Sequence, residues 1–263
     1  MLRTVYATRY VTPLREGGSL PAIVEADDLG LYVLKFRGAG QGPLALVAEL
    51  IAGEIGRALG LQVPELVKVE VDPPLGRNEE DPEIRDLLKA SVGLNLALDY
   101  LPGSVSFDPA ARDVVEADLA SSIVWFDAFV TNVDRTPRNP NLLWWHKVLY
   151  LIDHGAALYF HHNWQEIETM ARSRFPAVRD HVLLPWASRI EEADRRLRPR
   201  LNEALFAEIV AQIPDGWLMP EPDDRGGAAP AERRAGYVDY LTRRLAGSSV
   251  FVEEAVRARA QLV

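Results

Sequence analysis

The pattern of this chain changes once, near residues 99–103. Before this point, short runs rich in β-branched and aromatic residues predict strands, and one run, 44–59, has the apolar spacing of a helix. After it, helical patterns dominate, with one pair of short apolar runs between 142 and 152. This order predicts an α+β fold with two lobes. A β-rich N-lobe with one main helix, residues 1–98, precedes a hinge and a mostly helical C-lobe, residues 99–263. Two lobes enclose a cleft, which is a common place for a ligand.

The individual elements follow from the same patterns. The expected strands of the first lobe are residues 4–11, 21–25, 31–36 and 66–71, with a further apolar run at 90–100. The stretch 72–86 is polar and rich in proline and acid, so we expect a surface excursion there. The expected helices of the second lobe are residues 113–130, 165–172, 184–196, 201–212, 231–245 and 250–260.

Composition limits the class of protein. Hydrophobic residues make up 48% and charged residues 25% of the 263 positions, as in an ordinary globular protein. No stretch approaches the roughly 20 apolar residues of a membrane span, and residues 1–13 lack the apolar core of a secretory signal. Zero cysteines exclude disulfides and thiolate chemistry and fit a reducing compartment, so we expect a cytoplasmic protein. A formal charge of −9 argues against nucleic-acid binding, which needs a basic face.

One loop carries the clearest chemical signal. Asp134 and Asn139 lie five residues apart, with Pro137 between them, after a long apolar helix. Phosphoryl transfer uses this arrangement: the aspartate accepts or orients the proton of the attacking hydroxyl, and the asparagine binds a magnesium ion. Taken alone, the same residues could also form an ordinary Asx turn.

A second acid follows the next apolar strand. Asp153 comes directly after Leu151-Ile152 and is followed by His154 and Gly155. In this position its carboxylate can reach the mouth of the cleft and bind magnesium, which prefers hard oxygen ligands. The alternative is a simple cap at the end of the strand.

Three further features are candidates for nucleotide binding. Lys35 lies in an apolar strand, where its ammonium needs an anionic partner, and Glu49 lies in the helix of the first lobe. Such a lysine–glutamate pair holds the nucleotide phosphates in kinases. The backbone of Gly17 and Gly18 could approach phosphate oxygens closely. Each has a plainer interpretation: an edge-strand lysine, a solvated helix residue and a hairpin turn. Their occurrence in one order, on the expected element types, favours the joint interpretation.

The same residues resemble the HipA-like kinases and, more distantly, the phosphatidylinositol 3/4-kinases. The resemblance covers most of residues 10–160. It is carried by Val33-Leu34-Lys35, Ala48-Glu49, Gly60-Leu61-Gln62-Val63-Pro64-Glu65, Tyr100-Leu101-Pro102-Gly103, Asn132-Val133-Asp134-Arg135 with Asn139, and Ile152-Asp153-His154-Gly155.

The resemblance implies an α+β, two-lobed protein-kinase-like fold and a role for each position. Lys35 would contact the ATP phosphates and Glu49 would pair with it. Asp99, Tyr100 and Leu101 would form the hinge at the adenine, Asp134 would be the catalytic base, and Asn139 and Asp153 would bind magnesium. Apart from the resemblance, Arg135 and Arg138 follow Asp134 in the loop, and we expect one of them to neutralise Asp134 or the phosphates, or both to be solvated.

The predicted function is ATP- and Mg²⁺-dependent transfer of a phosphoryl group to a hydroxyl. By the resemblance, the first choice of acceptor is a serine or threonine on a protein, although the sequence does not identify it. The alternatives are a lipid or small-molecule kinase, and a nucleotide-binding pseudokinase that regulates a partner. The four residues Lys35, Asp134, Asn139 and Asp153 argue against the pseudokinase, whereas the untypical glycine loop at 16–21 argues for it.

Overall fold

A computed structural model describes residues 1–14, 20–76, 79–111, 114–219 and 228–262. Its strands are β1 (Thr4–Pro13), β2 (Ala22–Ala26), β3 (Leu31–Lys35), β4 (Leu66–Val71), β5 (Gly93–Asp99), β6 (Val105–Ser106), β7 (Leu142–Trp145) and β8 (Val148–Leu151). Its helices are α1 (Gly42–Ala58), α2 (Pro82–Ala90), α3 (Ala117–Val130), α4 (Ile167–Ala171), α5 (Ile190–Leu197), α6 (Glu203–Val210), α7 (Pro230–Ala246) and α8 (Ser248–Ala260). Short 3₁₀ turns lie between several of them.

The first five strands close into a barrel in the order β1-β2-β3-β5-β4. All neighbours are antiparallel except β1 and β4, which are parallel. Alternate residues of each strand point inward, so Val24, Leu34 and Val69 form part of an apolar core of their own. The prediction of a β-rich first lobe is therefore correct in kind, and the closed barrel is the more specific form that the structure shows.

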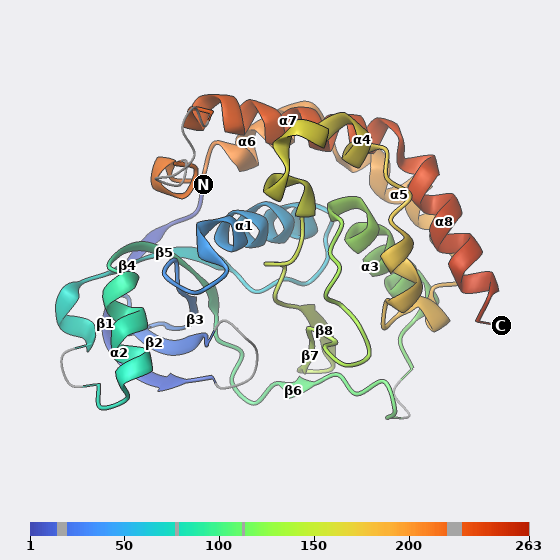
Figure 1. The fold of residues 1–263 in the computed structure, drawn as a ribbon. Coiled ribbons are helices and arrows are strands. Elements are labelled where there is room, and N and C mark those ends of the chain that lie inside the picture. The colour runs from blue at the N-terminus through green and yellow to red at the C-terminus, as the bar shows by residue number, and fades with distance from the viewer. Residues whose placement is uncertain (15–19, 77–78, 112–113, 220–227, 263) are drawn as a thin grey trace.

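One expectation for this region is wrong. Residues 82–86, expected as part of a surface excursion, belong to the helix α2, which packs on the barrel at one end of the molecule (Figure 1). Its N-cap is Asp81, whose side chain accepts from the Glu83 amide at 3.0 Å. Ile84 and Leu88, one helical turn apart, supply the buried face. The first lobe thus has a second, shorter helix besides α1.

Helix α1 lies between the barrel and the helices that follow it in the second part of the chain, α3 to α8 (Figure 1). It begins at Gly42, whose φ of 67° suits glycine, with Pro43 in the first turn. At Gly56 it packs closely, since a Cβ would lie 3.1 Å from Val63 and 3.4 Å from the Phe126 ring of α3. The glycine lets α1 approach the centre of the molecule, and this approach carries Glu49 into the interior.

The helical part is built around α3. Every residue of α3 from Ala120 to Val130 is buried, because α1, α5, α7 and α8 surround it (Figure 1). Residues of α1 such as Leu50 belong to this core and not to that of the barrel. The division into lobes at residue 99 remains a prediction, and the two hydrophobic cores do not divide at that residue.

The β7–β8 hairpin forms where it was expected, and β6 joins it to make a separate three-stranded sheet. Because β8 ends at Leu151, the hairpin delivers Asp153 toward α1 and β3. Among the described residues, no helix has the length and apolar character needed to cross a membrane.

A buried arginine joins α3 to the C-terminal helices. Arg244 of α7 has no exposed surface and donates to four backbone carbonyls: Ala128 at 2.5 Å, Phe129 at 2.7 Å, Ser173 at 3.1 Å and Ala171 at 3.2 Å. Two of these carbonyls lie in the last turn of α3, where helix carbonyls lack intrahelical partners.

We predict that Arg244→Met lowers the free energy of unfolding by about 3 kcal/mol, because it leaves several buried acceptors unsatisfied. Urea titration followed by circular dichroism measures the change. The control is Arg243→Met, next in the chain but paired at the surface with Asp239 and Glu168, which should leave the midpoint nearly unchanged. Equal effects of the two substitutions would contradict this account of Arg244.

Candidate active site

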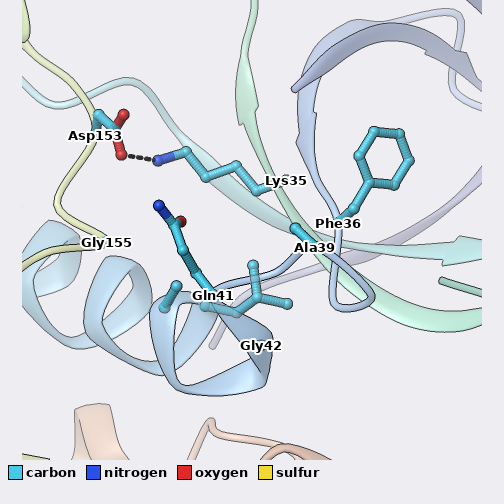
Figure 2. A pocket seen from close by; sticks show the side chains of 9 residues that line it. Lys35, Phe36, Ala39, Gln41, Gly42, Asp153 and Gly155 are labelled. Carbon is cyan, nitrogen blue, oxygen red and sulfur yellow. Dashed lines mark hydrogen bonds and ion pairs between the residues drawn. The ribbon is translucent and has the colours of Figure 1, made fainter. Parts of the chain in front are cut away.

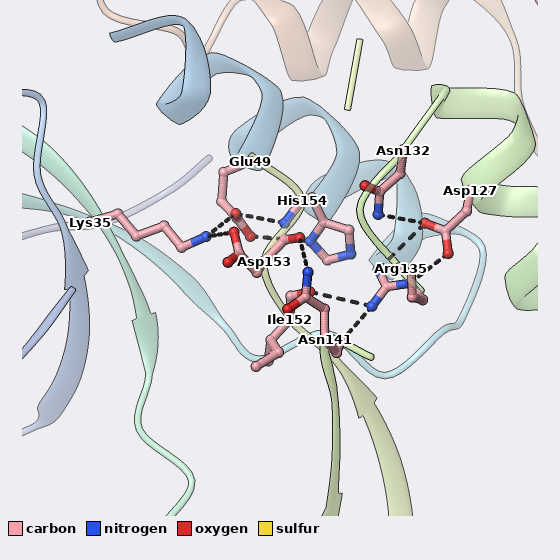
Figure 3. Close-up of polar contacts among 9 residues, drawn as sticks. All are labelled: Lys35, Glu49, Asp127, Asn132, Arg135, Asn141, Ile152, Asp153 and His154. Carbon is pink, nitrogen blue, oxygen red and sulfur yellow. Dashed lines mark hydrogen bonds and ion pairs between the residues drawn. The ribbon is translucent and has the colours of Figure 1, made fainter. Parts of the chain in front are cut away.

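Three charged residues from distant segments meet at the junction of the barrel and the helices. The Lys35 Nζ lies 2.5 Å from Glu49 Oε2 and 2.5 Å from Asp153 Oδ1 (Figure 3). Tyr32 and Leu34 fill the barrel, so the alternation of β3 turns Lys35 to the outer side, toward α1. The expected Lys35–Glu49 pair is therefore present. Glu54, which also lies on α1, pairs with Arg57 at 3.3 Å.

Asp153 reaches this junction through an unusual backbone conformation. Its φ is 56°, in the left-handed region that aspartate tolerates better than most residues. Its side chain remains 43% exposed, whereas that of Glu49 has no exposed surface. Asp153 is thus the acid of the pair that a ligand from solvent can reach.

The electrostatics of Glu49 depend on its partners. Burial alone would raise the pKa of this carboxyl, but Lys35 and His154 outweigh burial and hold the pKa well below its usual range. Burial likewise opposes the charged form of Lys35, while Glu49 and Asp153 raise its pKa above the usual value. Glu49 and Lys35 are therefore charged at neutral pH, and the carboxylates of Glu49 and Asp153 both face this one ammonium. This excess negative charge favours a cation.

His154 is a partner of Glu49 that the sequence analysis missed. Its backbone amide donates to Glu49 Oε2 at 2.8 Å, and its ring Nδ1 lies 3.1 Å from Glu49 Oε1 (Figure 3). The ring is fully buried and packs edge-on against Phe126, with a centroid distance of 5.7 Å. No local signal in the sequence indicates these contacts, which join residues 105 positions apart.

The loop after α3 holds Asp134 and Asn139 together. Asn139 Nδ2 donates to Asp134 Oδ2 at 2.7 Å, and Thr136 and Asn139 exchange backbone hydrogen bonds of 3.1 Å. Asp134 is half-buried, so its carboxylate remains reachable from solvent. A tight turn therefore presents the two residues side by side, as their spacing predicted.

Of the two arginines that follow Asp134, Arg135 is not solvated. Its side chain is 1% exposed and lies in the helical core, where Nε lies 2.6 Å from Asp127 Oδ2 (Figure 3). Its Nη1 donates to the carbonyls of Asn141 and Ile152. Arg135 thus ties the loop that carries Asp134 to the segment that carries Asp153. The physical reason is Asp127, a buried acid of α3 that requires a cation.

Asp127 has two further partners. Asn132 Nδ2 donates to its Oδ1 at 3.0 Å, and His181 Nε2 lies 2.9 Å from its Oδ2. The Leu183 amide donates to His181 Nδ1 at 3.0 Å, so the hydrogen is on Nε2 and points at Asp127. Burial opposes ionisation of Asp127, but Arg135 and His181 hold its pKa well below its usual range.

Asn141 is a second residue that the sequence analysis missed. It has a φ of 49°, is 9% exposed, and its Nδ2 lies 3.5 Å from the Asp153 carbonyl oxygen. The structure therefore places Asn141 beside Asp153, whereas the described contacts of the Asn139 side chain are with Asp134. The sequence Asn139-Pro140-Asn141 contains both asparagines, but spacing alone does not show which side-chain amide lies beside Asp153.

A small pocket opens beside Lys35 and Asp153, and the Gln41 side chain points toward this pair (Figure 2). The pocket is lined by Lys35, Phe36, Ala39, Gln41, Gly42, Ala45, Leu46, Asp153 and Gly155. Gly17 and Gly18, proposed as a phosphate-binding turn, lie outside the described residues.

The segment expected as a hinge connects β5 to β6. The amide of Asp99 donates to the Glu65 carbonyl at 2.8 Å, and that of Tyr100 to the Leu31 carbonyl at 2.9 Å. Leu101 is 5% exposed. Of the three backbone amides in the proposed hinge, those of Asp99 and Tyr100 therefore already donate hydrogen bonds to carbonyls of the first part of the chain.

The buried Asp127–Arg135 pair predicts a pH dependence of stability. Because the folded pKa of Asp127 is depressed, its stabilising contribution is complete above the ordinary pKa of about 4 and is lost as the pH falls below it. We predict that Asp127→Asn destabilises the protein at pH 7. It should also remove up to about 1.4 kcal/mol per pH unit from the slope of stability between pH 4 and 3. Urea titrations at several pH values measure both effects. The exposed Asp118→Asn is the control, and equal slopes in wild type and Asp127→Asn would contradict the assignment.

Comparisons with known proteins agree with this geometry. A sequence profile described as HipA-like kinase matches residues 8–234. A comparison with curated proteins found no match. Among solved structures, the Helicobacter pylori proinflammatory kinase CtkA superposes with a TM-score of 0.53 and 14% identity, over 92% of this chain and 94% of that one. The Golgi casein kinase with Mn/ADP bound gives 0.52 and 12% identity, over 96% and 73%.

At these identities, the two structures show that the fold is similar to that of known kinases. The profile match extends well beyond the residues 10–160 that carry the resemblance in sequence, and it includes Lys35, Glu49, Asp134, Asn139 and Asp153. The chain therefore belongs to the HipA-like kinase family and is a phosphotransferase.

Proposed function

We propose that this kinase transfers the γ-phosphoryl group of ATP, with Mg²⁺, to the hydroxyl of a serine or threonine on a protein. The observation that carries the proposal is the contact of Lys35 with both Glu49 and Asp153. This set supplies a cation for phosphate oxygens and an exposed acid for a metal ion. Arg135 links the Asp134 loop to the same place through the carbonyls of Asn141 and Ile152.

The residues fit magnesium in their chemistry. Asp153, Asn139 and Asn141 offer carboxylate and amide oxygens, the hard donors that Mg²⁺ prefers. Within the described residues, no group of three or more His, Asp or Glu side chains could hold a metal by itself. Mg²⁺ commonly completes its shell with substrate phosphates and water. A metal bound here would neutralise phosphate charge, and the Mn/ADP complex of the Golgi casein kinase supports the use of a divalent ion and a nucleotide.

Each protein group has a definite task in the proposed reaction. Lys35 binds phosphate oxygens, and Glu49 keeps the Lys35 side chain extended across the junction. Asp134 accepts the proton of the acceptor hydroxyl as the oxygen bonds to phosphorus and the bond to the leaving ADP oxygen breaks. Asn139, bonded to Asp134 at 2.7 Å, fixes the orientation of that carboxylate. Asn139 and Asp153 are the proposed metal ligands, and Asn141 is a further candidate.

We place the adenine at the segment Asp99–Leu101. Since the amides of Asp99 and Tyr100 are bonded within the barrel, the Leu101 amide is the proposed donor to the base. Residues 1–98 and 99–263 are the proposed lobes on either side. A phosphate-binding role for Gly17 and Gly18 remains a prediction.

The choice of a protein acceptor rests on the family and on the Golgi casein kinase, whose name states a protein substrate. A lipid or small-molecule hydroxyl is the alternative. Labelled ATP and a cell lysate, followed by separation of protein, lipid and small solutes, distinguish them. The cytoplasmic location likewise remains a prediction.

We predict that ATP with Mg²⁺ raises the melting temperature by about 5–10 °C at a concentration of 100 times Kd, because a ligand of the folded state stabilises by about 2.7 kcal/mol there. Asp153→Asn should remove the part of the shift that depends on Mg²⁺. Between Asn139→Ala and Asn141→Ala, the variant that loses more of this part identifies the amide ligand. A wild type without any shift at millimolar Mg²⁺-ATP would contradict the proposal.

We also predict that Asp134→Asn lowers kcat by about 10²- to 10⁴-fold and leaves the ATP-induced melting shift nearly intact, since a base acts in the chemical step. Phosphate transfer to the identified acceptor measures kcat. The control is Asp86→Asn, an exposed acid of α2 that pairs with Lys89, which should retain wild-type turnover. Wild-type kcat in Asp134→Asn would exclude Asp134 as the base.

A further inference from the structure

Glu49 is held from two sides. On one side is Lys35 of the barrel, and on the other is His154, whose backbone amide and ring each approach one carboxylate oxygen (Figure 3). Both Glu49 and His154 are fully buried. The carboxylate therefore has no water to replace a lost partner, and each hydrogen bond counts strongly toward its orientation.

The chemistry of the contact fixes the tautomer of His154. Glu49 is ionised and can only accept, so the nitrogen that faces it, Nδ1, carries the hydrogen. The other nitrogen, Nε2, is buried and has no hydrogen-bond partner among the described residues. Among the described contacts of the ring, the hydrogen bond is with Glu49 and the aromatic contact is with Phe126 of α3.

We propose that His154 is a positioning residue for the phosphate-binding lysine: its Nδ1–H holds Glu49 in the orientation that keeps Lys35 extended toward the nucleotide. The proposal rests on the proposed function for the identity of the ligand. His154 follows Asp153 directly, so the segment that offers the metal ligand also fixes α1 through Glu49. The Lys35–Glu49 pair is then kept by contacts within the protein itself.

Two substitutions separate the hydrogen bond from the packing. His154→Phe keeps a ring against Phe126 but removes the Nδ1 donor, whereas His154→Asn keeps an N–H donor near the position of Nδ1 but removes the ring. The hydrogen bond from the backbone amide of residue 154 to Glu49 remains in both variants. His162→Phe is the matched control, since His162 is exposed.

The first measurement does not require catalysis. An amine-reactive reagent labels lysines, and mass spectrometry compares Lys35 with the exposed Lys89 in the same sample. Labelling requires the neutral, mobile amine, so a loosened Glu49 should raise the Lys35 rate. We expect a rise of about tenfold in His154→Phe, and a rate within about threefold of wild type in His154→Asn and in His162→Phe.

The second measurement is steady-state kinetics with ATP. We expect kcat to fall by about tenfold or more in His154→Phe with a smaller change in KM for ATP, and to recover in His154→Asn. A purely packing role predicts the reverse order, with Phe harmless and Asn damaging in both assays. That reversed order, or unchanged Lys35 labelling in His154→Phe, would overturn the inference. A wild type with protected Lys35 but no nucleotide binding would overturn the proposed function and leave the structural link intact.

Discussion

A carboxylate without exposed surface requires partners, and Glu49 is the carboxylate around which this site is assembled. Removing one partner of a buried ion pair costs about 3–5 kcal/mol, because it leaves an uncompensated charge in the interior. Glu49 can be buried only because Lys35 arrives from the barrel and His154 from the end of the β7–β8 hairpin. The barrel, α1 and the hairpin therefore meet at one point for electrostatic reasons, and that point is where the proposed phosphate-binding groups lie.

The arrangement leaves a charge unbalanced where a ligand can use it. Lys35 neutralises one of its two carboxylate partners, and the other, Asp153, is the exposed one. In the proposed function Asp153 would hold a metal ion, Lys35 would face phosphate oxygens, and Glu49 would keep Lys35 in place. The protein thus holds its charges in positions that Mg²⁺ and phosphate would use with little reorganisation, which is the condition for electrostatic catalysis.

The sequence predicted those features that depend on local pattern. The strand of Lys35, the helix of Glu49 and the hairpin before Asp153 each follow from a periodicity within about ten residues. Helix α2 was missed although Asp81, Pro82 and the Ile84–Leu88 spacing mark it, because the acids and prolines around it were interpreted as loop. His154 and Asn141 could not be assigned in this way. Their contacts join segments that come together only on folding, so the spacing of residues along the sequence does not reveal these contacts.

Arg135 shows that a residue within a predicted catalytic motif can have a structural role. It follows the proposed base directly, and a cation beside a phosphate site invites a catalytic role. The fold instead uses it to satisfy Asp127, an acid buried in α3, and its remaining donors bind the carbonyls of Asn141 and Ile152. A buried guanidinium with five donors in a rigid fork can hold three segments at fixed distances, which a flexible ammonium cannot do as well. The position of Asp134 relative to Asp153 is therefore set within the helical part by Arg135, whereas the position of Lys35 relative to both is set across the junction by Glu49. Two buried ion pairs, Asp127–Arg135 and Lys35–Glu49, thus set the positions of the proposed reacting groups.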